Sequence, residues 1–230
     1  MIKNIIFDLG GVLLNISLPN TMTEFKKLGI DVDGMLERMK SSSQKSSGAT
    51  MCDGVAAFGP IDDYTAGNVS SEDFIKMWKQ QSRPDTTDAD IINAWNSCIF
   101  DIPQYRLDFI KEMRDKGYKT FMLSNTNDIH WIKIVEDCPQ LTSLFDGVFL
   151  SQEMHLAKPD PTIFKETLDR IGAPADECLF IDDSRNNTAV AAQYGIHTVT
   201  ADVSKWQPDG TFLPPATEWK EEVLNVLSEE

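Results

Sequence analysis

The sequence predicts an α/β fold, a doubly wound parallel sheet with helices inserted after its first strand. Short apolar runs alternate with segments of helical periodicity along most of the chain, as expected for parallel strands that are connected through helices. Polar residues follow directly after three of these runs, and the long segment behind the first run shows helical patterns only. The first two observations indicate a sheet with a ligand site at one edge, and the third indicates a helical insertion.

Four apolar runs have the length and composition of buried parallel strands. They occupy residues 2–7, 118–123, 148–150 and 178–181. The first run ends at Asp8, the second at Ser124, and the fourth at the adjacent acids Asp182 and Asp183. Because ligands of doubly wound sheets bind outside the carboxyl ends of the strands, we expect these side chains to share one site.

Helical segments separate the later runs and follow the last one. They are expected over residues 104–116, 161–171 and 187–194, and around Trp219, Val223 and Leu227. Asp160 and Pro161 stand where an N-cap and a first helical residue are expected, and both residue types are favoured there. Gly117 and Gly195 are placed to end two of these helices, since glycine readily adopts the left-handed conformation of a helix terminus.

The segment between the first two runs is interpreted as a helical cap. Helices are expected over residues 22–28, 36–40, 72–80 and 88–98, a loop rich in serine and glycine over residues 41–54, and a solvated turn at residues 62–64. The apolar residues of the last of these helices recur on one face, as in a helix that packs against others. We therefore predict a Rossmann-like core domain of residues 1–16 and 99–230 and a cap domain of residues 17–98.

The composition and charge of the chain limit the kinds of molecule that it can bind. The 230 residues carry a formal net charge of −15, which repels nucleic acids and anionic membranes. Asp8 interrupts the first apolar run too early for a secretory signal, and no later run approaches the length of a membrane span. The four cysteines lack zinc-ligand spacing, which favours reduced structural thiols. We expect a cytoplasmic protein that binds a small molecule and neither nucleic acid nor membrane.

Four short motifs occur in order along nearly the whole chain. They are IIFDLGGVL at residues 5–13, LSNT at 123–126, KPDP at 158–161 and FIDDS at 180–184. In these motifs and their order the chain resembles the haloacid dehalogenase superfamily of hydrolases. The resemblance implies an enzyme that hydrolyses a small phosphorylated metabolite.

The resemblance also implies a nucleophile and a metal. Asp8 would attack the phosphoryl group and form an aspartyl-phosphate, which water then hydrolyses. Mg²⁺ prefers oxygen ligands and tends to keep several waters, and Asp8, the backbone carbonyl of Gly10 and Asp183 would hold it. Phosphoryl transfer spreads negative charge over several oxygens, so the cation would help to neutralise that charge.

The same resemblance assigns the groups that bind phosphate. These are the Oγ of Ser124, the backbone amide of Asn125 and the ammonium group of Lys158. Asp182 would orient Lys158. Taken without the resemblance, Ser124 and Asp182 could also act as helix caps, and Lys158 as a solvated surface charge.

Gly10 departs from the pattern of many phosphatases of the superfamily, which have a second aspartate two residues after the nucleophile. That aspartate protonates the leaving oxygen, and a positioned acid typically contributes about 10²–10⁴-fold to the rate. The glycine therefore predicts either a slower enzyme or one suited to a leaving group that needs less protonation, such as that of a sugar 1-phosphate. A subgroup with Asp-Leu-Gly in its first motif resembles sugar-phosphate phosphatases, and we expect a sugar phosphate as the substrate.

Three alternatives stand beside this interpretation. A dehalogenase of the same fold would use Asp8 without a metal, which the adjacent acids Asp182 and Asp183 oppose. A phosphomutase would need the acid that Gly10 lacks, and a non-catalytic binding module would not need Asp8 together with Lys158. No metal-binding pattern joins the histidines, which are His130, His155 and His197.

Overall fold

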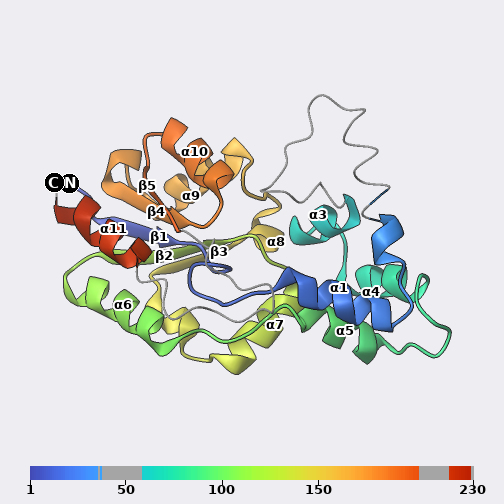
Figure 1. Ribbon diagram of the computed structural model, residues 1–230. Coiled ribbons are helices and arrows are strands. Elements are labelled where there is room, and N and C mark those ends of the chain that lie inside the picture. Colours follow the sequence, from blue (N-terminus) through green and yellow to red (C-terminus); the bar gives the residue numbers. More distant parts are fainter. Residues whose placement is uncertain (36, 38–58, 202–217, 229–230) are drawn as a thin grey trace.

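The computed structural model describes residues 1–35, 37, 59–201 and 218–228 (Figure 1). The expected helix at 36–40 and the expected loop at 41–54 lie outside the described residues, apart from residue 37. In Figure 1 the sheet and its flanking helices form one body, and most of the helices inserted between the first two strands lie beyond one end of the sheet.

All five strands of the described sheet run parallel, in the order β3-β2-β1-β4-β5. They are β1 (Asn4–Phe7), β2 (Lys119–Ser124), β3 (Gly147–Leu150), β4 (Cys178–Asp182) and β5 (His197–Thr200). The chain adds β2 and β3 on one side of β1, then crosses to add β4 and β5 on the other side. The predicted α/β fold with a doubly wound parallel sheet is confirmed, and the strand order reverses at β1 and β4.

The register of the central strands sets the position of the acidic residues. Phe7 lies opposite Ile181 of β4, and the amide of Asp8 donates to the carbonyl of Ile181 at 2.8 Å. This bond continues the pairing by one residue and brings Asp8 beside Asp182. On the other side of β1, Phe7 lies opposite Met122, two residues before Ser124. The carboxyl ends of three strands therefore meet near the reversal point, where doubly wound sheets bind ligands.

Helices cover both faces of the sheet (Figure 1). One face packs against α6 (Gln104–Asp115), α7 (Asp128–Asp137) and α11 (Glu218–Ser228), and the other against α8 (Ser151–Met154), α9 (Pro161–Ile171) and α10 (Arg185–Gln193). Side chains of a strand alternate between the faces, so Ile5 and Phe7 enter the first core and Ile6 enters the second. Both cores fix the strand ends that carry the polar residues.

Several predicted helix termini agree with the structure. Asp160 caps α9 by accepting a hydrogen bond from the amide of Thr162 at 2.8 Å. Helix α10 begins two residues earlier than expected because Ser184 is its N-cap and accepts from the amide of Asn187. Helices α7 and α8 were not expected from the sequence. Helix α7 has ten residues and begins directly behind the motif that ends β2, whereas α8 has only four residues and follows β3 at once.

The inserted helices share a core of their own. They are α1 (Leu18–Lys27), α3 (Gly59–Thr65), α4 (Ser71–Lys79) and α5 (Asp88–Asn96). Phe25, Phe74, Trp78 and Trp95 are buried together, and their rings contact one another in tilted, stacked and edge-on pairs. The chain leaves and re-enters the sheet region side by side, because Ile16 and Ile99 form an antiparallel bridge.

The turn expected at residues 62–64 is wrong, because these residues belong to helix α3. Tyr64 is only 1% exposed, and its ring stacks on Phe74 with centroids 4.1 Å apart. The acidic pair Asp62 and Asp63 suggested a solvated turn, but they occupy the outer side of a seven-residue helix. Helix α3 is therefore held in place by aromatic packing, and its sequence lacks the helical periodicity of apolar residues that would have predicted it.

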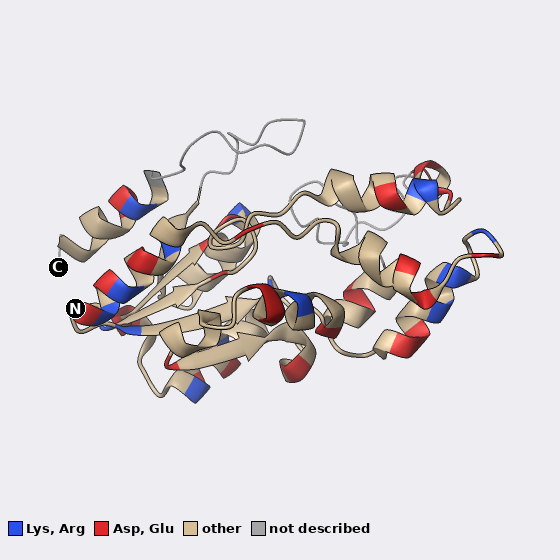
Figure 2. Cartoon of the chain, turned by 90° about the horizontal axis from the view of Figure 1, so that it is seen from below, with Lys and Arg blue, Asp and Glu red and all other residues tan. Residues whose placement is uncertain are grey.

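The distribution of charge follows the layers. Basic and acidic residues are interspersed on the outer helices, whereas the strands carry few of them (Figure 2). Among the described residues, no helix is both long and apolar enough to span a bilayer.

The three described cysteines, Cys98, Cys138 and Cys178, are buried free thiols, as the sequence predicted for this part of the chain.

Candidate active site

Asp8 lies at the carboxyl end of β1 and is 7% exposed. Its Oδ1 accepts two hydrogen bonds, from the amide of Leu9 at 2.7 Å and from Lys158 Nζ at 2.9 Å. Burial raises the pKa of Asp8 well above its ordinary value, and the neighbouring carboxylates Asp182 and Asp183 add to the rise, while Lys158 opposes it. The charged form of this nucleophile candidate therefore depends on nearby positive charge.

Lys158 brings three strand ends together. Its side chain is almost fully buried, and Nζ donates to Asp8 Oδ1, to Asp182 Oδ2 at 2.6 Å and to the carbonyl of Leu123 at 3.0 Å. An ammonium group has three donors, so all three are engaged. Burial alone would lower the pKa of Lys158, but the charges of Asp182 and Asp8 outweigh it and raise the pKa. Lys158 is thus a fixed cation.

Asp182 is fully buried, and both of its oxygens have partners. Oδ1 accepts from the amide of Ser184 at 2.8 Å and from Nδ2 of Asn187 at 2.9 Å, while Oδ2 accepts from Lys158. A carboxylate with this set of donors is held in one orientation and can orient Lys158.

Asn187 was not expected in the site. Its position in the first turn of the helix that follows Asp182 could have indicated that its side chain reaches this carboxylate.

Asp183 packs against the backbone of the loop that follows Asp8. A Cβ built on Gly11 would lie 2.5 Å from Asp183 Oδ2, and Gly11 has a positive φ of 77°. Both facts require glycine, because a side chain would be strained and would displace the carboxylate. The sequence indicated a glycine turn here, but it did not indicate that the turn makes room for Asp183.

Gly10 lies in the same loop and has no side chain that could act as an acid. The loop is closed by hydrogen bonds from Gly11 N to Leu14 O and from Leu14 N to Leu9 O. Neither of these bonds uses the carbonyl of Gly10, which therefore remains a possible metal ligand. A Cβ at this position would meet the end of the Ile16 side chain at 3.2 Å.

Ser124 is the last residue of β2 and Asn125 follows it. We call residues 124–127 the Ser124 loop. Ser124 is 2% exposed. The side chain of Asn125 forms two hydrogen bonds with the backbone of Lys158, accepting from its amide at 2.8 Å and donating to its carbonyl at 2.7 Å. The sequence suggested only the backbone amide of Asn125 as a phosphate ligand, so this link to Lys158 is an additional feature.

The acidic residues fit a hard divalent cation. Asp8, Asp182 and Asp183 each offer an oxygen within 4.8 Å of the other two. Asp182 already has four hydrogen bonds, so Asp8 and Asp183 are the better ligands. Oxygen ligands of this kind suit Mg²⁺.

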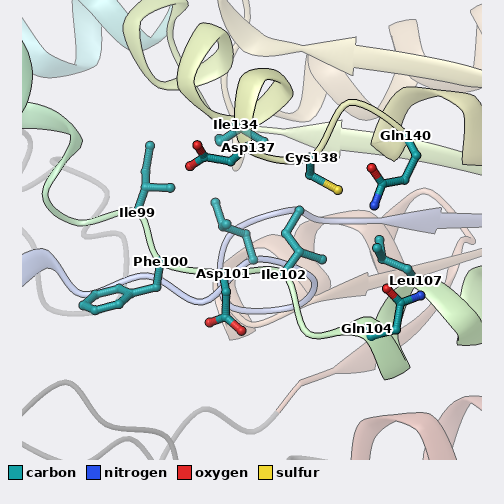
Figure 3. Close-up of a pocket in the computed structure, with 11 residues that line it drawn as sticks. Ile99, Phe100, Asp101, Ile102, Gln104, Leu107, Ile134, Asp137, Cys138 and Gln140 are labelled. Atoms are coloured by element: carbon teal, nitrogen blue, oxygen red, sulfur yellow. The ribbon is translucent and has the colours of Figure 1, made fainter.

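A separate pocket lies between the chain re-entering the core and the end of α7 (Figure 3). Its volume is about 410 Å³. Apolar side chains from Leu14, Ile99, Ile102, Leu107, Ile134 and Cys138 line it together with Asp101 and Asp137. None of the predicted site residues is among its lining residues, so the carboxylate cluster is not part of this pocket.

Comparison with known proteins identifies the family. A protein-family model described as haloacid dehalogenase-like hydrolase matches residues 2–195. The chain belongs to the haloacid dehalogenase-like hydrolases. The match covers all four motifs, which the structure gathers around Lys158.

This hydrolase has curated and structural relatives of nearly its own length. It is 26% identical to D-ribitol-5-phosphate phosphatase of Bacteroides thetaiotaomicron over 99% of this chain and 100% of that protein. A crystal structure of a family enzyme from B. thetaiotaomicron, in complex with magnesium and inorganic phosphate, is 31% identical with a TM-score of 0.73, covering 91% of this chain and 98% of that one. A predicted family hydrolase from Porphyromonas gingivalis has a TM-score of 0.76 and 28% identity over the full length of both chains.

More distant relatives share the fold alone. A solved L-2-haloacid dehalogenase is 16% identical with a TM-score of 0.61, covering 98% of this chain and 99% of that one. The sheet is thus common to family members whose names indicate different reactions, and the reaction of this hydrolase has to be argued from its own side chains.

Proposed function

We propose that this hydrolase is a magnesium-dependent phosphatase that releases phosphate from a small sugar phosphate through an aspartyl-phosphate on Asp8. The observation that carries the proposal is the position of Lys158 Nζ, 2.9 Å from Asp8 and 2.6 Å from Asp182. Asp183 offers a further carboxylate oxygen within 4.8 Å of those of Asp8 and Asp182. A nucleophile, a buried cation and a metal-binding acid in one place are the requirements of phosphoryl transfer.

In the first step a carboxylate oxygen of Asp8 attacks phosphorus, and the bond from phosphorus to the sugar oxygen breaks. In the second step water attacks the same phosphorus, and the acyl phosphate bond breaks to release inorganic phosphate and restore Asp8. Lys158 favours the charged form of Asp8 before attack and offsets negative charge on the phosphoryl oxygens afterwards. The Oγ of Ser124 and the amide of Asn125 donate to those oxygens.

Asp8, the carbonyl of Gly10 and Asp183 would hold Mg²⁺, which supplies positive charge at the transferring phosphoryl group. The fit of the acidic cluster to oxygen-liganded metals supports this assignment. Further support comes from the relative crystallised with magnesium and inorganic phosphate. Asp182 stays outside the metal shell and orients Lys158.

One observation supports the substrate class. The full-length curated relative is named a D-ribitol-5-phosphate phosphatase, and the phosphate of that substrate is carried by a primary alcohol. Gly10 provides no acid for a leaving oxygen of this kind, so we expect slower release from such a substrate than from a sugar 1-phosphate. We propose that residues 17–98 form a cap that closes over the carboxyl ends of the strands and selects the substrate.

The test is a phosphate-release assay with purified protein, an aryl phosphate and a panel of sugar phosphates, sugar-alcohol phosphates, nucleotides and pyrophosphate. We expect release that requires Mg²⁺, is abolished by a chelator and is highest with sugar or sugar-alcohol phosphates. Release of halide from a 2-haloacid without metal would indicate a dehalogenase instead. No turnover of any substrate with Mg²⁺ present would indicate a non-catalytic module.

A further inference from the structure

The inserted helices form hydrogen bonds with the core at the end of the Ser124 loop and the start of α7. In the first contact, Nε1 of Trp95 in α5 donates to Oδ1 of Asn127 at 3.2 Å. The carbonyl of Trp95 accepts a hydrogen bond from Nε2 of His130 at 3.1 Å. Nε2 carries the ring proton, because Nδ1 of His130 accepts a hydrogen bond from Nδ2 of Asn127. The rings of Trp95 and His130 stack with centroids 4.7 Å apart. This contact joins α5 to the start of α7.

In the second contact, Tyr64 of α3 reaches the first turn of α7. Its hydroxyl accepts from the amide of Ile129 at 3.2 Å and shares a second hydrogen bond with Ser71 Oγ at 2.8 Å. Ile129 is the second residue of α7, where helical amides have no partner within the helix. The N-cap Asn127 satisfies the amide of His130, and Tyr64 satisfies the amide of Ile129. A residue of the insertion therefore completes a helix of the core.

A third contact passes through Ser151, which is fully buried at the start of α8. Its Oγ accepts from the amide of Thr126 at 3.0 Å and donates to the carbonyl of Thr65 at 2.7 Å. Nearby, a Cβ on Gly67 would lie 2.2 Å from the carbonyl oxygen of Gln152. The end of α3 thus lies directly against the backbone of the core, and the hydroxyl of Ser151 connects it to the Ser124 loop.

We infer that Tyr64 is a positioning residue that couples the seating of the inserted helices to the geometry of the Ser124 loop. The inference rests on the proposed function, in which this loop holds the phosphate. With Tyr64 seated, the amides of Ile129 and His130 in the first turn of α7 are both satisfied, and the loop before the helix is held in one arrangement. Since coupling between two binding events is reciprocal, phosphate bound at the loop stabilises the seated arrangement of α3.

The experiment compares Tyr64→Phe with Ser71→Ala. The first variant keeps the ring on Phe74 but removes the acceptor of the Ile129 amide. The second removes the other partner of the same hydroxyl and leaves the bond to Ile129 in place. Three quantities are measured for both variants and the wild type: amide hydrogen exchange at Ile129 and Thr126, inhibition by inorganic phosphate in the presence of Mg²⁺, and kcat and KM with an aryl phosphate.

We expect Tyr64→Phe to speed exchange at both amides and to weaken phosphate inhibition and raise KM by about three- to tenfold, the usual effect of one lost hydrogen bond, with a smaller change in kcat. Ser71→Ala should keep wild-type values. Unchanged phosphate inhibition in Tyr64→Phe, despite faster exchange at Ile129, would overturn the inference. If wild-type protein releases no phosphate and does not respond to it, the proposed function fails, while the exchange data still report the Tyr64–Ile129 contact.

Discussion

The Nζ of Lys158 lies 2.9 Å from Oδ1 of Asp8 and fills the space between this carboxylate and that of Asp182. One buried cation thus serves two buried carboxylates that belong to different strands. Removing one member of a buried ion pair leaves an uncompensated charge and is strongly destabilising. Stability and chemistry are linked at this residue, because the same contact favours the charged form of Asp8.

Lys158→Met removes the cation while keeping an unbranched apolar chain of similar length. We expect the free energy of unfolding to fall by about 3–5 kcal/mol at neutral pH and phosphate release to be lost. Urea denaturation followed by circular dichroism measures the stability. The double variant Lys158→Met with Asp182→Asn should lose less than the sum of the two single variants. Wild-type stability in Lys158→Met would contradict the buried triad.

Asp8→Asn keeps the shape of the nucleophile but removes its charge. Lys158 retains Asp182 as a partner, so the fold should persist, and the midpoint of thermal unfolding should stay near or above that of the wild type. Phosphate release should fall on the order of 10⁴-fold or more, as for other essential nucleophiles. Asp169→Asn, on the exposed face of α9, is the control. Mass spectrometry of acid-quenched wild-type enzyme should find one phosphoryl group on the Asp8 peptide, and full activity of Asp8→Asn would exclude the covalent route.

The convergence on Lys158 could be predicted because it depends on strand ends. Asp8, Ser124 and Asp182 each follow a short apolar run, and parallel strands place their carboxyl ends at one edge. The resemblance to a known family then supplied the roles. The residue at the centre, Lys158, follows no strand directly, and only its motif indicated that it enters the site.

The contacts between the insertion and the core could not be predicted in this way. Tyr64 lies in a seven-residue helix next to two acids, so neither apolar periodicity nor composition marks it as buried. Its position depends on stacking with Phe74 of the next helix and on the hydrogen bond from the amide of Ile129, which is distant in sequence. Likewise, position 11 requires glycine partly because a side chain there would displace Asp183, a residue far along the chain. Local sequence carries no signal for such pairs.

His130 should make stability depend on pH. Burial lowers its pKa from 6.5 to about 4, and the hydrogen bond to the Trp95 carbonyl opposes this only in part. The unfolded chain binds a proton near pH 6.5 and the folded chain does not, so this residue contributes stability above pH 6.5 that is lost as the pH falls toward 4. We expect a loss of about 3 kcal/mol between neutral pH and pH 4.

The test is urea denaturation between pH 4 and 7.5 for the wild type, His130→Gln and the exposed control His155→Asn. The difference in stability between wild type and His130→Gln should shrink as the pH falls, because the variant has no imidazole to protonate. Asp8 titrates in the opposite direction, since its raised pKa favours the folded state at low pH, but it is common to all three proteins. A pH-independent difference would show that His130 is not held neutral.

Gly11→Ala should separate backbone strain from the displacement of Asp183. A non-glycine residue with a positive φ costs on the order of 1–2 kcal/mol, and here the new Cβ would also lie 2.5 Å from the carboxylate oxygen. Gly172→Ala is the matched control, because φ is 70° there and no atom lies within 4 Å of the added Cβ. Backbone strain should lower the stability of both variants by a similar amount in urea denaturation, and the contact with Asp183 should lower that of Gly11→Ala further.

Only Gly11→Ala should weaken the Mg²⁺ dependence of phosphate release, by about tenfold or more, because loss of an interaction at a metal ligand typically costs that much. Equal Mg²⁺ dependence in the two variants would mean that Asp183 is not a metal ligand, since its displacement would then leave the cation unaffected.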